Sequence, residues 1–288
     1  MTTRSTRTST SSDPGGGAAD RERRLFDLLR SFESVVVAFS GGVDSAYLAW
    51  AATRTLGRSA LCVTAESPSY PDHHRQLARQ VASACGLFHE TVATGELEQD
   101  EYRRNPTNRC YFCKRELYTV LSALAAARGY RVIVDGSNAD DRGDYRPGRG
   151  AAREHGVRSP LDDVGLSKAE IRELSRRAGL PTWDEPASAC LSSRIPYLSE
   201  VTDAKLRMIE RAEASLRAIG FRVCRVRHHD AAVAHVEIGQ EDLARAFEPD
   251  WRTRIVEAVL AAGYATVTID PRGYRTGSLN EGLMLRPV

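Results

Sequence analysis

Short apolar segments alternate with longer segments of helical spacing along most of the chain. Four segments have the apolar, β-branched character of buried strands: 34–39, 60–65, 88–93 and 131–136. Apolar residues recur with the spacing of a helix from about Asp44 onward, and again over about 71–85, 112–128 and 167–181. Strands that alternate with helices are typical of a parallel sheet with helices on both faces. The pattern therefore predicts an α/β fold with a doubly wound parallel sheet.

The pattern changes near residue 200. A helical segment over 202–219 leads to the strand-like "GFRVCRVRHHD" and "AVAHVEIG", then to a helical stretch over 241–262 and the strand-like "YATVTID". This order predicts a smaller C-terminal α/β domain with hairpin-like pairing. The N-terminus is rich in Ser, Thr and Gly and lacks the apolar core of a secretory signal. We therefore expect a disordered tail over 1–20, a first domain over 21–199 and a second over 200–288.

Composition and charge argue against several classes of protein. Lys and Arg number 40 and Asp and Glu 38, so the net charge of +2 gives no basis for a nucleic-acid binder held by bulk charge. No apolar run approaches the roughly 20 residues that span a bilayer. With 42% hydrophobic and 27% charged residues, the composition is that of a globular protein. We expect a cytoplasmic protein that binds neither nucleic acid nor membrane.

The sequence "SGGVDS" follows the first predicted strand. Gly41 and Gly42 permit positive φ and let backbone N–H groups approach an anion, while Ser40 and Ser45 add hydroxyl donors at the start of a helix. Asp44 would repel a phosphate, so it fits either a bridging Mg²⁺ ion or a capping role. The loop has no lysine of the Walker type. It predicts a pyrophosphate site, and a plain tight turn with capping residues is the alternative.

The six cysteines are too few for a disulfide scaffold in a chain of 288 residues. Cys110 and Cys113 form a CxxC at the start of a helical segment, and Cys190 lies in the loop-like "EPASACLSSRIP". No second CxxC is present for a zinc site. Three thiolates that meet at one point suit a [4Fe–4S] cluster whose fourth iron keeps an open position, and three unrelated thiols are the alternative. The other cysteines are expected to be small buried side chains: Cys62, Cys85 and Cys224.

"AFSGGVDS" after an apolar strand resembles the signature of the PP-loop ATP pyrophosphatases. Members of that superfamily cleave ATP between the α and β phosphates, adenylate an oxygen of the substrate and let a nucleophile displace AMP. The resemblance implies ATP and Mg²⁺ as cofactors, with Asp44 and Ser45 in the catalytic loop. It also implies that the loops after the second and fourth strands lie near the nucleotide or substrate, through Ala65, Glu66, Ser67, Gly136, Asn138 and Asp140 or Asp141.

Motifs in both halves of the chain narrow the resemblance. "NPTNRCYFCK", "DGSNADDRGDYRPG", "EPASACLSSRIPYL", "CRVRHHD" and "PRGYRTGSLN" together are similar to the LarE family of ATP-dependent sulfur transferases. This similarity implies adenylation of pyridinium-3,5-biscarboxylic acid mononucleotide, a small nucleotide substrate. Sulfur then replaces AMP to give a thiocarboxylate, a step in the synthesis of the nickel-pincer nucleotide cofactor of lactate racemase.

The family includes two chemical versions. In one, a cysteine that matches Cys190 donates its own sulfur and becomes dehydroalanine. In the other, three cysteines hold a [4Fe–4S] cluster that carries an additional sulfide. We expect the cluster version, because Cys110 and Cys113 have no task in the sacrificial one, and Cys190 is catalytic in either. The source that reloads the sulfur stays open.

Three other functions are alternatives to sulfur transfer of this kind. A tRNA thiolase should carry a basic surface or an added RNA-binding domain, and the near-neutral charge argues against it. An amide-forming ligase should carry a glutaminase or ammonia-channel domain, and the sequence shows none. A nucleotide- or metal-binding module without turnover is the alternative from another class, which release of pyrophosphate from ATP would exclude.

Arg225 and Arg227 lie two apart on one face of a predicted strand, so both can point at one anion. A solvated strand edge is the alternative. The family resemblance implies that these arginines bind the substrate phosphate, with Arg194 as a second contact to that phosphate or to the adenylate. Further candidates are Glu237, expected to face the substrate; His228, His229 and His235, expected to be polar strand or loop residues rather than metal ligands; and Tyr274 and Arg275, expected at a subunit contact of a homohexamer.

Overall fold

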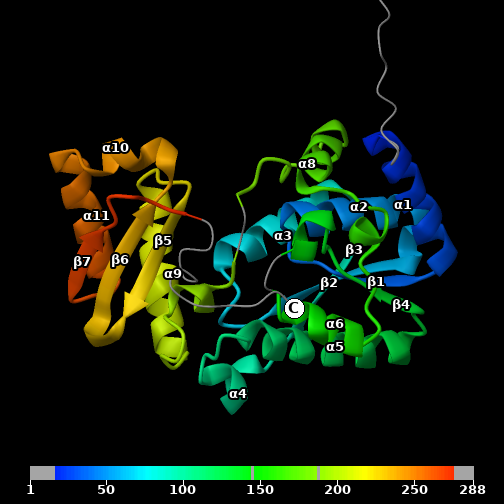
Figure 1. The fold of residues 1–288 in the computed structure, drawn as a ribbon, viewed down its shortest axis with the longest axis horizontal. Coiled ribbons are helices and arrows are strands. Elements are labelled where there is room, and N and C mark those ends of the chain that lie inside the picture. Colours follow the sequence, from blue (N-terminus) through cyan, green and yellow to red (C-terminus); the bar gives the residue numbers. More distant parts are fainter. Residues whose placement is uncertain (1–16, 144–145, 187–188, 276–288) are drawn as a thin grey trace, which may run out of the picture.

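The computed structural model describes residues 17–143, 146–186 and 189–275 of the chain. Its first sheet has four parallel strands in the order β3-β2-β1-β4 (Figure 1). Val36 pairs with Leu61 on one side and with Ile133 on the other, and all three side chains are buried. The expected parallel α/β fold is confirmed. The strand bounds are Val35–Ala38 (β1), Ala60–Glu66 (β2), Phe88–Ala93 (β3) and Val132–Val134 (β4).

Helices cover both faces of this sheet because successive side chains of a strand point to opposite faces. Val35 and Val37 pack with α1, α2, α3, α7 and α8, whereas Val36 and Ala38 pack with α5 and α6 (Figure 1). Each fully buried Val or Leu contributes about 1.5–3 kcal/mol. The helix bounds are Ala18–Phe32 (α1), Val43–Leu56 (α2), Asp72–Ala84 (α3), Arg109–Arg128 (α5), Gly148–Glu154 (α6), Pro160–Asp163 (α7) and Lys168–Arg177 (α8).

Three of these helices begin at positions that bear on the sequence predictions. α1 begins at Ala18, so the tail expected over 1–20 is too long by three residues, while residues 1–16 lie outside the described part. α5 begins at Arg109 rather than near 112, which brings both cysteines of the CxxC into its first turns. α8 begins with a capping box, in which Ser167 and Glu170 each satisfy the other's backbone N–H.

The second sheet has three strands in the order β5-β6-β7, with β5 and β6 antiparallel and β6 and β7 parallel. The hairpin expected from the sequence is therefore present. The single helix expected over 241–262 is two helices, because Glu248 is extended and Pro249 starts the second one. The bounds are Asp203–Ala218 (α9), Cys224–His229 (β5), Val233–Ile238 (β6), Leu243–Ala246 (α10), Pro249–Ala261 (α11) and Thr266–Ile269 (β7). The domain division at residue 200 stays a prediction.

A small apolar cluster joins the two sheets. Tyr102 of α4 (Asp100–Arg103) packs with Leu191 and Ile195 of the connecting segment and with Leu206 and Ile209 of α9. Phe112 and Cys113 of α5 border the same cluster. The segment that carries Cys190 is therefore held between the start of α5 and the start of the C-terminal unit. Within the described ranges, no helix combines the length and apolarity needed to cross a bilayer.

Candidate active site

The turn between β1 and α2 has the geometry of an anion cradle. Gly41 has a φ of +70°, and a Cβ there would lie 2.9 Å from the Cα of Ala78, so the position requires glycine. The hydroxyl oxygens of Ser40 and Ser45 are 3.1 Å apart, and Ser45 donates to the carbonyl of Gly42 at 3.1 Å. The loop thus ends at the N-terminus of a helix of 14 residues, where backbone N–H groups and the helix dipole favour an anion.

The end of β4 packs directly against this turn. A Cβ at Gly136 would lie 2.9 Å from the backbone nitrogen of Ser45 and 3.1 Å from its Cα, so only glycine allows the two segments to touch. The neighbouring Asp135 is held by hydroxyl groups of Tyr118 at 2.8 Å and Ser159 at 2.7 Å. Two of the polar loops expected at the carboxyl edge of the sheet therefore meet in space.

Asp44 is positioned to bind a cation. Its Oδ2 accepts a hydrogen bond of 2.5 Å from the ammonium of Lys168. Its Oδ1 is buried, and among the described residues no group donates a hydrogen bond to it. An unsatisfied carboxylate oxygen in the interior is costly and fits a metal ligand such as Mg²⁺. The backbone N–H of Lys168 also donates to Asp140 at 2.9 Å, which brings a second carboxylate to this edge.

Lys168 was not predicted from the sequence. It occupies the first position of α8 and lies 124 residues from Asp44 along the chain. The fold brings the Lys168 ammonium to the β1–α2 turn, which has no lysine of the Walker type of its own. The sequence does contain the capping box of Ser167 and Glu170, which marks Lys168 as the first residue of a helix.

The other expected nucleotide residues lie at the same edge of the sheet. Ala65 and Glu66 end β2, and Glu66 pairs with Arg79 at 3.1 Å. Ser67 is nearly buried, and its hydroxyl donates to Glu96 at 2.5 Å. On the β4 side, Asn138 accepts from the backbone of Asp140 and its own N–H donates to Asp141, both at 3.0 Å. Glu96, which no sequence pattern pointed to, fixes the β2 loop because Ser69 also donates to it, at 2.6 Å.

The three unusual cysteines come together. Cys110 and Cys113 lie in the first turns of α5, and Cys190 lies just before the short helix Leu191–Arg194. Burial raises the pKa of the Cys113 thiol, and the charges of Glu96 and Cys190 raise it further. Burial and Cys190 also raise the pKa of Cys110, against the effect of Arg109. Among the described residues, the three sulfur atoms do not all lie within 4.8 Å of one another, so they do not form a ready site for a single ion.

Buried groups hold this arrangement. Arg109 donates to the carbonyl of Ser192 at 3.0 Å and to the side chain of Asn105. Tyr102 and Ser192 share a hydrogen bond of 2.6 Å. The backbone N–H of Leu191 donates to the carbonyl of Ser69 at 2.8 Å. This last contact ties the residue after Cys190 to the loop 67–69 after β2. That loop is expected to lie near the nucleotide and is called the nucleotide loop below.

Arg194 does not face a ligand site. It is 1% exposed, and its guanidinium donates to both carboxylate oxygens of Glu213, at 2.8 and 2.9 Å. It also donates to the carbonyls of Ala189 and Cys190 at 2.8 and 3.0 Å. Although burial alone would raise the pKa of Glu213, Arg194 lowers it to about 2. We therefore reassign Arg194 from a nucleotide or phosphate contact to a residue that anchors the Cys190 segment.

Arg225 and Arg227 share one face of β5, as expected from their spacing. Arg227 donates to the carbonyl of Ser193 at 2.7 Å and to Glu237 at 2.8 Å, so both arginine and glutamate lie behind the Cys190 segment. The guanidinium of Arg225 lies 5.0 Å from the ring centre of Tyr274. Tyr274 thus packs against its own chain, and its place at a subunit contact stays a prediction.

The remaining candidates lie away from the cysteines. His228 contacts the hydroxyl of Tyr264 at 3.2 Å, and His235 lies 3.3 Å from Asp270. His229 is exposed at the end of β5. Arg275 lies 3.6 Å from Asp270 and donates to a carbonyl of its own turn. Of the expected buried cysteines, Cys62 and Cys224 are buried, whereas Cys85 is only half-buried at the end of α3.

Comparison with known proteins identifies the family. The sequence model of the asparagine synthase family matches residues 26–142. A synthase of pyridinium-3,5-bisthiocarboxylic acid mononucleotide from Lactiplantibacillus plantarum is 31% identical over 266 residues, which cover 92% of this chain and 95% of that protein. This chain belongs to the LarE family.

The chain is also similar to two other proteins. An uncharacterised protein of Synechocystis is 42% identical to this LarE-family chain over 265 residues, covering 91% of the chain and 98% of the relative. One chain of a glutamine-hydrolysing GMP synthase from Methanothermobacter thermautotrophicus is 27% identical over 198 residues, covering 63% of the LarE-family chain and 62% of that relative. The LarE-family protein is an enzyme of the ATP pyrophosphatase type, and it uses ATP.

Proposed function

We propose that this enzyme adenylates the carboxylates of pyridinium-3,5-biscarboxylic acid mononucleotide and replaces AMP with sulfur to give thiocarboxylates. One observation carries the proposal. The hydrogen bond from Leu191 to Ser69 holds the Cys190 segment against the nucleotide loop. A sulfur donor beside the nucleotide is what transfer to an adenylated substrate requires, since the reacting atoms must be close. The name of the Lactiplantibacillus plantarum relative supports the thiocarboxylate product.

The nucleotide binds at the β1–α2 turn. Backbone N–H groups at Gly41 and Gly42, with the hydroxyls of Ser40 and Ser45, hold the β and γ phosphates at the helix N-terminus. The substrate carboxylate attacks the α phosphorus, and pyrophosphate leaves. Lys168 lies 2.5 Å from the loop carboxylate and offsets the charge that develops on the leaving pyrophosphate.

Asp44 and Asp140 would hold Mg²⁺, which shields the phosphate charges when it is bound. The unsatisfied Oδ1 of Asp44 supports this assignment. Arg225 and Arg227 would hold the substrate phosphate, because they share one face of β5 and Arg227 donates to the carbonyl of Ser193, three residues after Cys190. The adenylated carboxyl group would then lie between the nucleotide loop and the cysteines.

Cys110, Cys113 and Cys190 would hold a [4Fe–4S] cluster. Cys190 lies close enough to raise the pKa of both Cys110 and Cys113, which supports a site that the three thiols share. When bound, the cluster supplies a sulfide that displaces AMP from the acyl carbon. The site would be open to solvent and substrate, since Cys110 is exposed and Cys113 and Cys190 are half-buried.

Anaerobic reconstitution tests the sulfur source. We expect about four iron atoms per chain with the absorption of a cluster, lost in Cys110→Ser, Cys113→Ser and Cys190→Ser. The reconstituted enzyme should release AMP and pyrophosphate only with the pyridinium substrate. A colourless protein that binds no iron, transfers one sulfur and is left with dehydroalanine at position 190 would exclude the cluster and establish the sacrificial version. A protein that releases no pyrophosphate with this substrate would overturn the proposed reaction.

We also propose a homo-oligomer, as a hexamer, on the basis of the family resemblance. Light scattering of the purified chain tests the assembly. A monomer at micromolar concentration would overturn this assignment and leave the chemistry above unaffected.

A further inference from the structure

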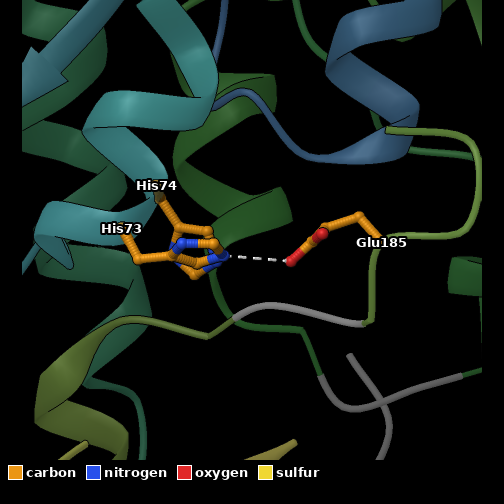
Figure 2. A group of neighbouring side chains, drawn as sticks. All are labelled: His73, His74 and Glu185. Carbon is orange, nitrogen blue, oxygen red and sulfur yellow. Dashed lines mark hydrogen bonds and ion pairs between the residues drawn. The ribbon is translucent and has the colours of Figure 1, made fainter. Parts of the chain in front are cut away.

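Two neighbouring histidines and a distant glutamate face one another beside the Cys190 segment. His73 and His74 lie in the first turn of α3, and Glu185 lies in the loop that follows α8 (Figure 2). One nitrogen of each histidine and one carboxylate oxygen all lie within 4.8 Å of one another. Among the described residues, this is the group of His, Cys, Asp and Glu side chains whose ligand atoms converge in this way. These three side chains have no part in the proposed reaction.

The spacing of the group also fits a coordinated ion. Nε2 of His73 and Oε1 of Glu185 share a long hydrogen bond of 3.3 Å (Figure 2). Two ligands at about 2.0 Å from a tetrahedral ion lie about 3.3 Å apart, so these atoms already have the separation of one tetrahedral edge. The ring of His74, 5.2 Å from that of His73 between centres, supplies the third ligand after a small rotation.

The donor atoms suit a transition-metal ion. Two imidazoles and one carboxylate favour Zn²⁺, Co²⁺, Ni²⁺ or Fe²⁺ over Mg²⁺ and Ca²⁺, which prefer oxygen ligands.

The surroundings hold Glu185 and leave a path for the ion. Arg172 donates to the carbonyl of Glu185 at 2.7 Å, which fixes its backbone. Arg222 approaches the carboxylate at 3.8 Å, but both its terminal nitrogens lie closer to Asp184, at 3.1 Å, which offsets its charge. A cavity of about 320 Å³ borders His73 and Glu185, so solvent reaches the group. Arg217 also lines this cavity and is paired with Glu210 at 3.4 Å.

We propose that His73, His74 and Glu185 bind one divalent transition-metal ion, with water at the remaining position. The ion joins α3, which follows the nucleotide loop, to a residue that lies five positions before Cys190. It thereby fixes the approach of the Cys190 segment to the nucleotide. The site is separate from the three cysteines, and its occupancy does not depend on the sulfur source or on the substrate.

Cobalt binding tests the site. The probe is Co²⁺ alone, added to the chelator-treated, tag-free full chain that carries Cys110→Ser, Cys113→Ser and Cys190→Ser, so that these thiolates cannot capture it. We expect one Co²⁺ per chain, with d–d absorption and no sulfur-to-metal charge transfer. Removing a group that only hydrogen-bonds to a metal ligand weakens metal binding about 10–100-fold. Removing a ligand itself should weaken it more, so His73→Ala and Glu185→Gln should each raise the Kd for Co²⁺ at least about 100-fold.

His229→Ala is the matched control, because His229 is an exposed histidine of the same chain that lies outside the group. It should leave the Kd unchanged. A second measurement covers folding: Co²⁺ should raise the melting temperature of the parent and of His229→Ala but not that of Glu185→Gln. Binding that is absent, or that survives both His73→Ala and Glu185→Gln, would overturn the site. Binding lost in His73→Ala but retained in Glu185→Gln would exclude the three-ligand arrangement.

Discussion

The buried ion pair behind Cys190 allows a quantitative test of how the sulfur segment is held. Arg194 and Glu213 are each 1% exposed, and two contacts of 2.8 and 2.9 Å join them. Arg194→Met removes the nearest cation and leaves a buried carboxylate with Arg217 at 3.5 Å and the backbone N–H of Val226 at 3.1 Å as its partners. Breaking a buried pair costs about 3–5 kcal/mol, and these remaining partners place the expected loss near the lower end. The pKa of Glu213 gives a consistent magnitude, because a fall from 4.5 to about 2 corresponds to about 3 kcal/mol at roughly 1.4 kcal/mol per pH unit.

Urea unfolding at several pH values measures this cost. At pH 7, Arg194→Met should lower the unfolding midpoint by on the order of 1 M. A carboxylate with a lowered pKa stabilises the folded state above its unfolded value and loses that contribution as the pH falls through its folded value. The stability that ionised Glu213 contributes to the wild type should therefore be fully present above about pH 4.5 and should be lost towards pH 2, as Glu213 becomes protonated.

The double variant Arg194→Met/Glu213→Leu separates pairing from packing. Replacing a whole buried pair by apolar side chains is often neutral or stabilising, so the double variant should recover most of the stability that the single variant loses. Both variants lack the guanidinium that holds the carbonyls of Ala189 and Cys190, so both should retain less iron after reconstitution. A single variant within 1 kcal/mol of wild type, or a double variant no more stable than the single one, would refute this account.

Three further substitutions test the site. Gly136→Ala should strongly lower AMP formation and should lower the free energy of unfolding by about 1–3 kcal/mol, because its Cβ would lie 2.9 Å from the nitrogen of Ser45. Gly143→Ala is the control and should change neither, since a Cβ there meets nothing within 4 Å. Lys168→Met should lower the rate of pyrophosphate release at least about tenfold. It should lower the free energy of unfolding by less than about 1 kcal/mol, because its partly exposed ion pair contributes little to folding. A large loss of stability that accompanies the loss of activity would instead indicate a structural role. Asn105→Gly should lower the free energy of unfolding by about 1–3 kcal/mol, because the side-chain amide of Asn105 donates to three buried or half-buried carbonyls. Glycine tolerates the φ of +53° at this position, so backbone strain is not added. An unchanged midpoint of denaturant unfolding would contradict this.

The sequence predicted the parallel sheet because the signal for it is local. β1, β2 and β4 are short apolar runs, whereas the edge strand β3 is mixed and only half-buried, and a glycine-rich turn marks the end of β1. The spacing of Arg225 and Arg227 also sufficed to place them on one face, since side chains two apart in a strand point the same way. The prediction of a single helix over 241–262 was wrong, because apolar periodicity does not record that Pro249 starts a new helix.

Contacts between distant residues could not be predicted in this way. Lys168 and Asp44 are 124 residues apart, and His73 and Glu185 are 112 apart, so no motif records either pair. The family resemblance suggested that Arg194 contacts the substrate phosphate or the adenylate. Its actual partner, Glu213, lies on the buried face of a helix whose orientation only the packing of the two sheets decides.

The close connection between the nucleotide loop and the cysteines has a chemical reason. An acyl adenylate reacts with water, so a sulfur donor must already be in place when the adenylate forms. Glu96 serves both parts, because it accepts hydrogen bonds from Ser67 and Ser69 in the nucleotide loop and its charge raises the pKa of Cys113. The carbonyl of Ser69 in turn accepts a hydrogen bond from the N–H of Leu191. Hydrogen bonds thus connect the loop after β2 to the Cys190 segment, which in the proposed reaction would keep adenylation and sulfur transfer close together.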